Sequence, residues 1–334
     1  MVVLLLLSLF LFGSCSCEIP CDDSSFRVLS YNVQTLFDDR LDGCEYEEYQ
    51  DTDAWNSRSY RMRLRTLSTV LLDASLGYPD VLVLQEVENS QVVKDLLSYH
   101  LGAKGYHWYA AAKEDGGAIS VAVISRHPIG RTLVHATENC RPILQADIAT
   151  SRETVSIFAL HAKSQIGEYQ QTEALRLELV KSLKQAAQKC RDNLVLLCGD
   201  FNEDPVAVWE GNGVQTALVD AGYPDAQAYA AKGSLLISGD QNLVGPSIWY
   251  DSYLDQSYEQ KREGSCNWDG TWHSYDQILC NSKVFDHMGW EYADFCVCDQ
   301  GRCLTTDGKP HGWNLPTQEG VSDHLPVLLT LKRR

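Results

Sequence analysis

The sequence lacks several features that would assign it to a common class of protein. No serine or cysteine stands in a recognisable nucleophile motif, so a covalent hydrolase mechanism is disfavoured. No internal repeat and no proline- or serine-rich linker divides the 334 residues, which favours a single domain. Basic residues are scarce, with 28 Lys and Arg against 45 Asp and Glu and a formal net charge of −17. So acidic a surface opposes non-specific attachment to nucleic acid and argues against a dedicated nucleic-acid-binding module. It does not exclude an enzyme with one local basic groove and a bound cation.

The sequence also lacks a long hydrophobic run, because the apolar stretch at the N-terminus covers only residues 1–13. A membrane span needs about 20 apolar residues, so this stretch resembles the hydrophobic region of a secretory signal instead. Gly13-Ser14-Cys15 resembles a loose bacterial lipobox, in which Cys15 would be acylated and attach the protein to a membrane. Cleavage near Ser16 without acylation is the alternative. We therefore expect residues 1–17 to be a signal peptide or lipoprotein signal, and the protein to be secreted, periplasmic or a membrane-anchored lipoprotein.

Cysteine, by contrast, is plentiful. The chain has twelve cysteines, which fit an exported protein better than a cytosolic one. No histidine lies at zinc-ligand spacing from the cluster near the C-terminus, so disulfides that staple a long loop are predicted in preference to a metal site. This cluster consists of Cys266, Cys280, Cys296, Cys298 and Cys303.

Apolar patterning predicts alternating strands and helices. Apolar, β-branched runs predict strands over residues 26–33, 80–87, 106–112, 119–125, 144–149, 155–160, 193–198, 278–279 and 327–331. Helical spacing of apolar residues predicts helices over 61–74, around 92–97 and over 172–190. The acidic, tyrosine-rich segment 38–60 shows no period and is predicted to be a surface loop. Some strands pair directly and others alternate with helices, which predicts an α/β fold with mixed sheets.

Short polar motifs follow nearly every apolar run. Side chains at strand ends can converge in space although they are far apart in sequence. Two imidazoles, several acids and two carboxamides suit metal-assisted attack of water on a phosphate ester, so the set predicts a hydrolase. In chain order the motifs are Ser30-Tyr31-Asn32, Leu84-Gln85-Glu86-Val87, His161, Cys198-Gly199-Asp200-Phe201-Asn202, Tyr275-Asp276-Gln277-Ile278 and Ser322-Asp323-His324-Leu325-Pro326.

Carboxylates at the strand ends are candidate metal and water ligands. Glu86 follows four buried apolar residues, where a hard divalent cation such as Mg²⁺ would be a natural partner, unless the side chain simply emerges into water. Asn32 and Asp323 would complete the metal shell, largely through waters. Asp200 and Asn202 are two positions apart, so both point to one face of an extended strand. A Gly-Asp-x-Asn turn is the alternative for that pair.

Histidines and basic residues supply candidate acid–base and phosphate-binding groups. Asp323 is a poor orienting partner for its neighbour His324, because adjacent residues on a strand face opposite ways. Asp276 is the better candidate for fixing the tautomer of His324. Three basic residues are candidate phosphate contacts, with solvated surface charge as the alternative: Arg126, Arg141 and Lys163.

Taken in this order, the motifs resemble the endonuclease/exonuclease/phosphatase superfamily. This metal-dependent group includes deoxyribonuclease I, apurinic endonucleases, bacterial sphingomyelinases and inositol polyphosphate 5-phosphatases. The resemblance spans about residues 26–331 and rests most strongly on Gly199-Asp200-Phe201-Asn202 and Ser322-Asp323-His324. It implies a four-layer α/β sandwich over residues 24–334, with two mixed β-sheets packed face to face and helices outside. His161-Ala162-Lys163-Ser164 leans toward secreted bacterial nucleases.

The resemblance implies in-line attack of water on a phosphoester, with Mg²⁺, or Mn²⁺ or Ca²⁺ in its place, as the cofactor. Glu86 would bind the metal, with Asn32 and Asp323 nearby. His324, oriented by Asp276, would activate the water.

The same resemblance assigns the remaining groups. His161 would donate to the phosphate or the leaving oxygen, with Glu114 as its partner. Asp200 and Asn202 would position the nucleophile and stabilise the transition state. Family members differ over whether a histidine or this aspartate is the base, so that choice stays open.

The predicted function is an exported, monomeric, metal-dependent endonuclease whose substrate is DNA. A phospholipid head group or an inositol polyphosphate is the alternative substrate on the same fold. The lipid alternative predicts an exposed aromatic hairpin built from Trp249, Tyr250, Tyr253 and Tyr258, for which core filling is the competing interpretation. A catalytically inactive surface-binding protein is a third hypothesis, which the complete motif set disfavours.

Overall fold

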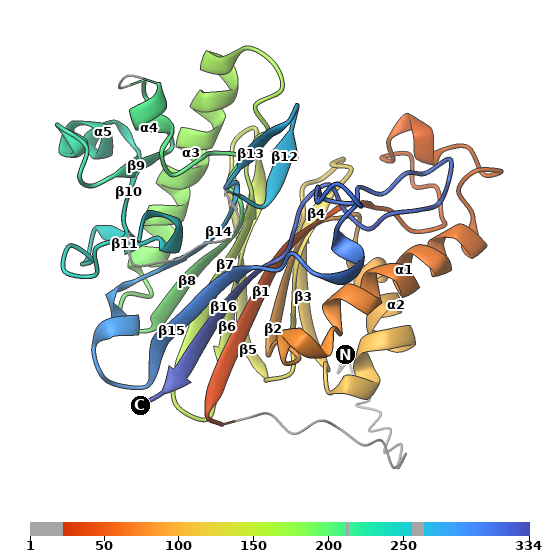
Figure 1. Cartoon of the computed structure of the whole chain (residues 1–334), viewed down its shortest axis with the longest axis horizontal. Helices are drawn as coiled ribbons and strands as arrows, with labels where there is room; N and C mark the ends of the chain where they lie inside the picture. The colour runs from red at the N-terminus through yellow and green to blue at the C-terminus, as the bar shows by residue number, and fades with distance from the viewer. Residues whose placement is uncertain (1–22, 212–213, 256–263) are drawn as a thin grey trace, which may run out of the picture.

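The computed structural model describes residues 23–211, 214–255 and 264–334. The predicted signal over residues 1–17, its Cys15 and Tyr258 lie outside these ranges. Two large mixed sheets with helices on their outer faces make up the described part, so the predicted fold class is confirmed (Figure 1). None of the described helices is long and apolar enough to cross a membrane.

The first sheet has six strands in the order β15-β16-β1-β2-β4-β3. β1 and β2 are parallel, and the other neighbours are antiparallel. Because parallel strands end at the same edge of a sheet, Asn32 and Glu86 emerge side by side there. The strands are β1 (Ser25–Leu36), β2 (Val81–Val87), β3 (Trp108–Lys113), β4 (Ser120–Ser125), β15 (Trp290–Val297) and β16 (Val327–Arg333).

The second sheet has eight strands in the order β5-β6-β7-β8-β14-β11-β10-β9. In its centre, His161 on β7 is in register with Asp200 on β8, and Asp200 is in register with Asp276 on β14. Residues directly opposite on neighbouring strands point to the same face, so these three side chains form a row. The strands are β5 (Ile129–Thr137), β6 (Cys140–Ala149), β7 (Thr154–His161), β8 (Leu194–Asp200), β9 (Leu218–Asp220), β10 (Leu235–Ser238), β11 (Ile248–Tyr250) and β14 (Asp276–Cys280).

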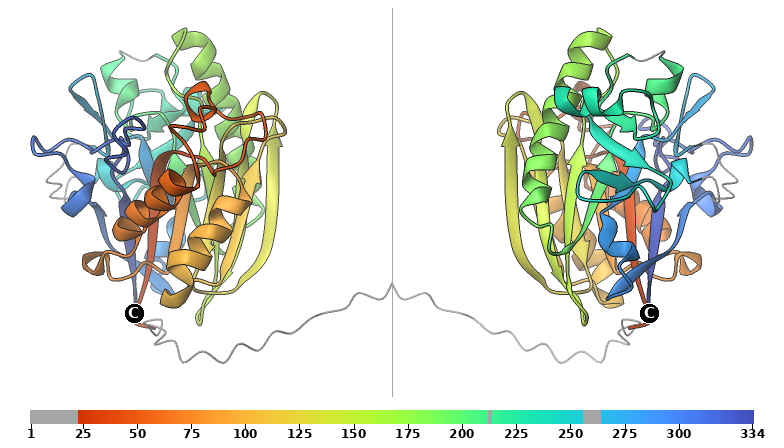
Figure 2. Two further views of the ribbon diagram at one scale, coloured as in Figure 1. Left: turned by 90° about the vertical axis from the view of Figure 1, so that its right-hand side faces the viewer. Right: turned by 90° about the vertical axis from the view of Figure 1, so that its left-hand side faces the viewer.

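Alternation along the central strands builds the layers. On β7, Ile157 belongs to the core between the two sheets, and its neighbour Phe158 belongs to the core beneath α3 (Tyr169–Gln188). A strand buried on both faces reads as a continuous apolar run, as the sequence has it. Helices α1 (Ser57–Leu71) and α2 (Ser90–Leu96) cover the outer face of the six-stranded sheet, and α3 covers the eight-stranded one (Figure 2).

Shorter elements complete the described chain. β12 (Cys266–Trp268) and β13 (Thr271–His273) form a separate hairpin. The remaining helical turns are α4 (Ala207–Glu210), α5 (Ala226–Lys232), the π-helical η3 (Leu97–Leu101) and the 3₁₀ turns η1 (Glu47–Tyr49), η2 (Ala74–Leu76), η4 (Gly102–Lys104), η5 (Ser252–Leu254), η6 (Ser282–Phe285) and η7 (Gly301–Cys303).

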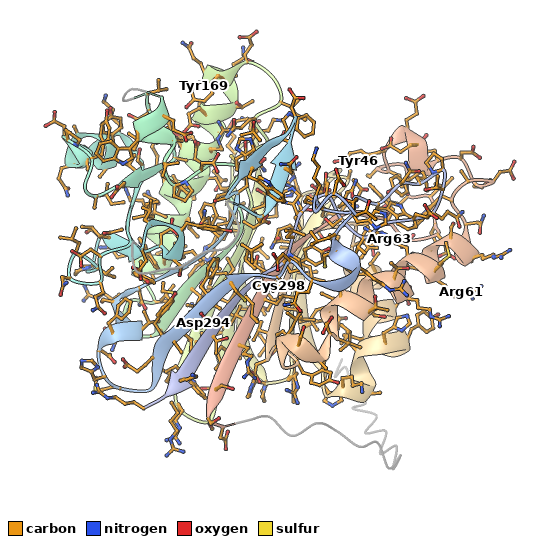
Figure 3. The ribbon with its side chains drawn as sticks, viewed as in Figure 1. Tyr46, Arg61, Arg63, Tyr169, Asp294 and Cys298 are labelled. Carbon is orange, nitrogen blue, oxygen red and sulfur yellow. The ribbon has the colours of Figure 1, made fainter. Side chains whose placement is uncertain are left out.

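The segment 38–60 is more than a surface loop. It contains η1 and the start of α1, and the rings of Tyr49 and Trp55 are buried with an edge-to-face contact of 5.1 Å between centroids. Trp55 also contacts Trp313, which stacks on the guanidinium of Arg63 at 4.6 Å. Arg63 belongs to α1 (Figure 3). Most of the acidic residues face water, although Asp38 and Glu45 are buried, and the aromatic ones anchor the segment. This division has no fixed period for a sequence pattern to detect.

The predicted disulfides are not formed among the described cysteines. All nine of these cysteines are free thiols, including the five of the C-terminal cluster. Cys296 and Cys298 lie two residues apart at the end of β15, and their thiols hydrogen-bond to each other. Two residues of extended chain separate Cα atoms by about 6.6 Å, near the upper limit for a disulfide. Cys296 lies on β15 and Cys298 directly follows it. The sequence pattern did not predict this strand, which is at the edge of the six-stranded sheet.

Gly199 allows strands β7 and β8 to approach each other closely. Gly199 on β8 has φ +147°, and a Cβ placed there would lie 2.0 Å from the carbonyl oxygen of Leu160 on β7. We expect Gly199→Ala to lower the free energy of unfolding by about 4 kcal/mol or more, because backbone must shift to admit the methyl group. Urea denaturation would measure this. Gly245→Ala, whose Cβ would meet nothing within 4 Å, is the control, and equal losses in both variants would contradict the argument.

Candidate active site

Asp200 lies at the centre of a group of polar side chains delivered by both sheets. Its Oδ2 accepts a hydrogen bond from Asn32 Nδ2 at 3.0 Å, and its Oδ1 accepts one from the backbone N–H of Asn202 at 2.8 Å. The Nε2 atoms of His161 and His324 lie 3.6 and 4.0 Å from the same Oδ2. Asp200 is 2 % exposed, and this burial, partly offset by the charge of His324, raises its pKa.

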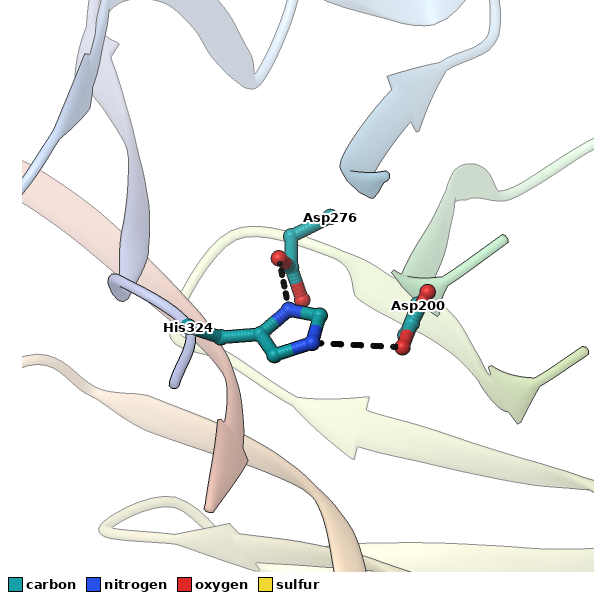
Figure 4. A group of neighbouring side chains, drawn as sticks. All are labelled: Asp200, Asp276 and His324. Carbon is teal, nitrogen blue, oxygen red and sulfur yellow. Dashed lines mark hydrogen bonds and ion pairs between the residues drawn. The ribbon is translucent and has the colours of Figure 1, made fainter. Parts of the chain in front are cut away.

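His324 is held by Asp276, as the sequence predicts. Nδ1 of His324 donates to Asp276 Oδ2 at 2.7 Å, which leaves Nε2 facing Asp200 (Figure 4). Burial alone would lower the pKa of His324, but the carboxylate of Asp276 outweighs it and the pKa rises well above the usual range. Ser265 Oγ donates to the same carboxylate oxygen at 2.6 Å. Because one oxygen serves both donors, the orientation of Asp276 is fixed.

His161 lies on the other side of Asp200, and its pKa is shifted in the opposite direction from that of His324. Burial, followed by the positive charges of Arg141 and His324, lowers its pKa well below the usual range. Its Nδ1 has no hydrogen-bond partner among the described residues. The predicted partner, Glu114, is exposed on the turn after β3, so the predicted contact between Glu114 and His161 is wrong. The two histidines therefore differ in their tendency to carry a proton.

Glu86 sits on a β-bulge at the end of β2. The register of β2 against β4 shifts between Gln85 and Val87, and Glu86 has φ +63°. Such a bulge re-aims a side chain, and here it sends the carboxylate toward the second sheet. Glu86 Oε1 accepts from Asn32 Nδ2 at 3.1 Å and lies 3.8 Å from His161 Nε2, while Oε2 accepts from the backbone N–H of Thr35 at 2.8 Å.

These residues fit a hard divalent cation. Burial and then the negative charge of Asp323 raise the pKa of Glu86, so an added positive charge here is favourable. Carboxylate and amide oxygens are the ligands that Mg²⁺ prefers. Asp323 itself is exposed at the rim, with its backbone N–H bonded to Gln34 Oε1 at 3.0 Å. Asp200, Asp276 and His324 also lie within ligand distance of one another, but the bond from His324 to Asp276 favours an acid–base pair.

The loops beside the site are tied together by buried polar groups. Asn202 Nδ2 donates to the carbonyl of Ala162 at 3.2 Å, which joins the end of β8 to the end of β7. Arg176 on α3 is fully buried and donates to Glu203 Oε2 at 3.2 Å and to the carbonyl of Lys163 at 3.0 Å. These bonds fix the positions of both loops with respect to the row of His161, Asp200 and Asp276.

Two of the three predicted phosphate contacts lie near the site. The charges of Arg141 and Lys163 both act on His161, and Arg141 Nη1 donates to the carbonyl of Ala162 at 3.1 Å. The prediction for Arg126 is wrong. It follows β4, whose Ser125 pairs with Val81 at the start of β2, so Arg126 lies at the opposite edge of the sheet from Glu86. In an antiparallel pair, a residue after one strand meets the beginning of the other.

Sequence reasoning missed Ser265 and Cys266, which both contact the His324–Asp276 pair. Ser265 is fully buried, and the thiol of Cys266 interacts with the imidazole of His324. They lie on the hairpin segment that runs into β12, where a bridge joins Cys266 to His324. A short strand of three residues carries no detectable period, so only the fold places them here.

The family model described as "Endonuclease/Exonuclease/phosphatase family" matches residues 29–324. The chain belongs to this family. No match was found among the curated proteins. As a member of the endonuclease/exonuclease/phosphatase family, the chain is a phosphoesterase with a candidate divalent-metal site.

Solved structures of other members share the fold at low sequence identity. A humanized TDP2 of D. rerio is 14 % identical with a TM-score of 0.57, over 92 % of this chain and 99 % of that one. An AP endonuclease from Archaeoglobus fulgidus is 15 % identical with a TM-score of 0.54, over 91 % and 98 %. The mannosyl-6-phosphatase Bt3783 of Bacteroides thetaiotaomicron is 16 % identical with a TM-score of 0.55, over 92 % and 100 %. Identities this low establish the fold and leave the substrate open.

The contact between Asp276 and His324 predicts the pH response of this family member. Asp276 raises the pKa of His324, so Asp276→Asn should lower it. The limb of the pH–rate profile that His324 sets should move to lower pH, and kcat should fall by about 10²-fold or more because the tautomer is no longer held. A profile of kcat between pH 5 and 9 measures both. An unshifted limb would show that Asp276 does not control His324.

Proposed function

We propose that this phosphoesterase is an exported, Mg²⁺-dependent endonuclease that hydrolyses phosphodiester bonds of DNA. One observation carries the proposal: His161, Asp200 and Asp276 lie in register on three neighbouring strands, with His324 bonded to Asp276 and Glu86 beside Asp200. This places acid, base and metal ligands around one point. Such an arrangement supports in-line attack of water on a phosphoester.

The ion would be held by Glu86, with Asn32 and Asp323 completing the shell through waters. When bound, Mg²⁺ would neutralise the developing charge on the phosphate oxygens. Asn32 donates to both Glu86 and Asp200, so it keeps the metal ligand and the central aspartate at a fixed separation.

Asp200 can remove a proton from the attacking water, with His324 beside it as the protonated partner, because Asp276 raises the pKa of that imidazole. Nε2 of His324 is aimed at Asp200, and Asp200 is itself protonatable near neutrality because burial raises its pKa to about 7. A proton taken from water on this side can be shared between them. His161 faces the opposite side of Asp200, where its neutral imidazole can donate a hydrogen bond to a phosphate or leaving oxygen. Asn202, with Arg141 and Lys163, would position the phosphate.

The choice of DNA rests on the chemistry of the site together with the printed names of fold neighbours. One neighbour is described as a D. rerio TDP2 "complexed with single strand DNA product", and another as an AP endonuclease. A mannosyl-6-phosphatase shares the fold equally well, so a sugar phosphate is the main competing substrate. A net charge of −17 means that DNA must be bound locally, through Arg141, Lys163 and the cation.

The exposed aromatic hairpin that the phospholipid alternative requires is not formed by the described residues predicted for it. Tyr250 is buried, with edge-to-face contacts to Phe285 and Tyr292, each 4.9 Å between centroids. Trp249 and Tyr253 are partly buried and pack against the cores. These aromatic residues therefore help to fill the core, as the competing interpretation predicts.

We further propose that residues 1–17 direct secretion, that acylation of Cys15 attaches the protein to a membrane, and that the protein acts as a monomer. Mass spectrometry of the protein recovered from cells would show a lipid on Cys15, a new N-terminus after it, or neither.

A panel of substrates tests the proposed function. The protein is incubated with Mg²⁺ and supercoiled plasmid, sphingomyelin vesicles, an inositol polyphosphate and mannose 6-phosphate. We expect DNA to be cleaved with a kcat/KM about 10²-fold or more above the others, because a site that has to use the whole diester loses rate on a truncated substrate. Faster release of phosphate from mannose 6-phosphate or inositol polyphosphate would replace the proposal with a phosphatase. No turnover on any substrate with Mg²⁺, Mn²⁺ or Ca²⁺ would support the inactive surface-binding protein.

A further inference from the structure

A second group of carboxylates lies apart from the active site. Asp42 and Glu45, on the loop between β1 and α1, meet Glu88, which follows β2. One oxygen from each lies within 4.8 Å of the others. Glu45 is 6 % exposed and Glu88 is 1 % exposed, whereas Asp42 faces solvent. The group is thus nearly buried and open to water through one residue.

Glu88 carries an unsatisfied oxygen in this group. Its Oε2 accepts from the backbone N–H of Asp38 at 2.5 Å, but its Oε1 has no hydrogen-bond partner among the described residues. A buried carboxylate oxygen without a partner is costly, and a cation would satisfy it. The orphan oxygen is a separate observation from the gathering of acids, and it points to a missing ligand.

The charges in the group are only partly balanced. Lys113 Nζ lies 3.6 Å from Asp42 Oδ2 and offsets one of three carboxylates. Glu45 accepts backbone N–H groups of Asp42 and Gly43, which fixes its carboxylate but leaves lone pairs on both oxygens. In these contacts a single ammonium therefore serves a group of three carboxyl groups.

We propose that Asp42, Glu45 and Glu88 form a second cation site, which binds Ca²⁺. Ca²⁺ takes oxygen ligands at about 2.3–2.6 Å in flexible geometry, so oxygens up to about 5 Å apart can share one ion. Mg²⁺ demands a tighter octahedron and keeps its waters, which suits this spacing less well. This site is distinct from the proposed metal position at Glu86. It does not include Glu86, and besides Glu88 its ligands are Asp42 and Glu45 of the β1–α1 loop.

A cation here would fasten the loop to the end of β2. Asp38, whose N–H bonds to Glu88, also accepts from Trp55 Nε1 at 2.6 Å through its carbonyl. Tyr46 on the same loop interacts with Arg141 beside the active site. Ca²⁺ would thus hold the loop that reaches the phosphate-binding side, and we expect it to raise the thermal unfolding midpoint.

Terbium luminescence tests the proposal. Tb³⁺ substitutes for Ca²⁺, and we expect Trp55 to sensitise it, because its Nε1 bonds to Asp38, whose N–H bonds to Glu88. The titration is made in a Glu86→Gln background, which weakens the active-site metal position. We expect saturable luminescence that Ca²⁺ displaces, with an affinity at least about 10-fold lower after Glu45→Gln, because one charged ligand is lost.

Glu47→Gln is the matched control. It removes the same charge from an exposed residue two positions along the loop, and it should leave the affinity unchanged. Glu45→Gln retains an oxygen that can accept a backbone N–H, and Asp42→Asn at the exposed ligand guards against a folding defect. Equal affinities in the Glu45→Gln and Glu47→Gln variants, or no Ca²⁺-displaceable signal in the Glu86→Gln background, would overturn the proposal.

Discussion

Replacing His324 with glutamine is expected to lower kcat on a phosphodiester by about 10³-fold or more. The imidazole is buried, its Nδ1 is held by Asp276 at 2.7 Å, and its Nε2 faces Asp200. Glutamine can keep a hydrogen bond to Asp276 but cannot accept and release a proton near neutral pH. The loss should therefore fall on kcat while KM changes little.

The control for His324→Gln is a histidine that lies outside the active site. His287 is largely exposed, with a side-chain exposure of 70 %, so His287→Gln should retain full activity. Initial rates of DNA cleavage at saturating substrate measure both variants, and thermal unfolding checks that both are folded. A His324→Gln variant that keeps more than a tenth of wild-type kcat would contradict the assignment.

Glu86→Gln is expected to lower activity at about 1 mM Mg²⁺ by about 10²-fold or more, because the carboxylate is the proposed direct ligand of the ion. Gln retains an oxygen that can accept from Thr35 N–H, and the change removes a charge whose pKa is raised by burial and by Asp323. The fold should therefore tolerate it.

A Mg²⁺ titration separates a metal ligand from a general loss of structure. In the Glu86→Gln variant the midpoint for Mg²⁺ activation should move to higher concentration, with part of the activity returning when Mg²⁺ is in excess. Glu138→Gln, at an exposed residue after β5, should keep the wild-type midpoint. An unchanged midpoint in Glu86→Gln would show that another group holds the ion.

Much of the site was predictable because it is built at strand ends. Val81–Leu84 and Leu194–Leu197 are apolar runs typical of buried strands, and the acidic residue near the end of each strand, Glu86 or Asp200, reaches the site there. The opposite facing of neighbours on a strand disfavoured Asp323 as the partner of His324 and left Asp276 as the better candidate. The register that aligns His161 with Asp200 and Asp276 could not be derived, since it depends on which strands are neighbours.

The predictions that failed also depended on how the strands are arranged, which local sequence does not determine. Arg126 follows an apolar strand as Glu86 does, yet β4 runs antiparallel to β2, and strand direction is not written in local sequence. β5 was missed because its side chains are mostly exposed along an edge strand, so it lacks alternation. Ser265 and Glu88 gained their roles only through contacts with residues distant in the chain.

Nicking of supercoiled plasmid tests the central claim most directly. The protein is assayed with Mg²⁺, with EDTA in excess, and again after Mg²⁺ is restored. If the residues around Asp200 form a metal-dependent phosphodiesterase site, nicked circles should appear with Mg²⁺, stop with EDTA and resume on restoration. Nicking that continues in EDTA, or folded protein that never nicks the plasmid, would contradict a metal-dependent endonuclease.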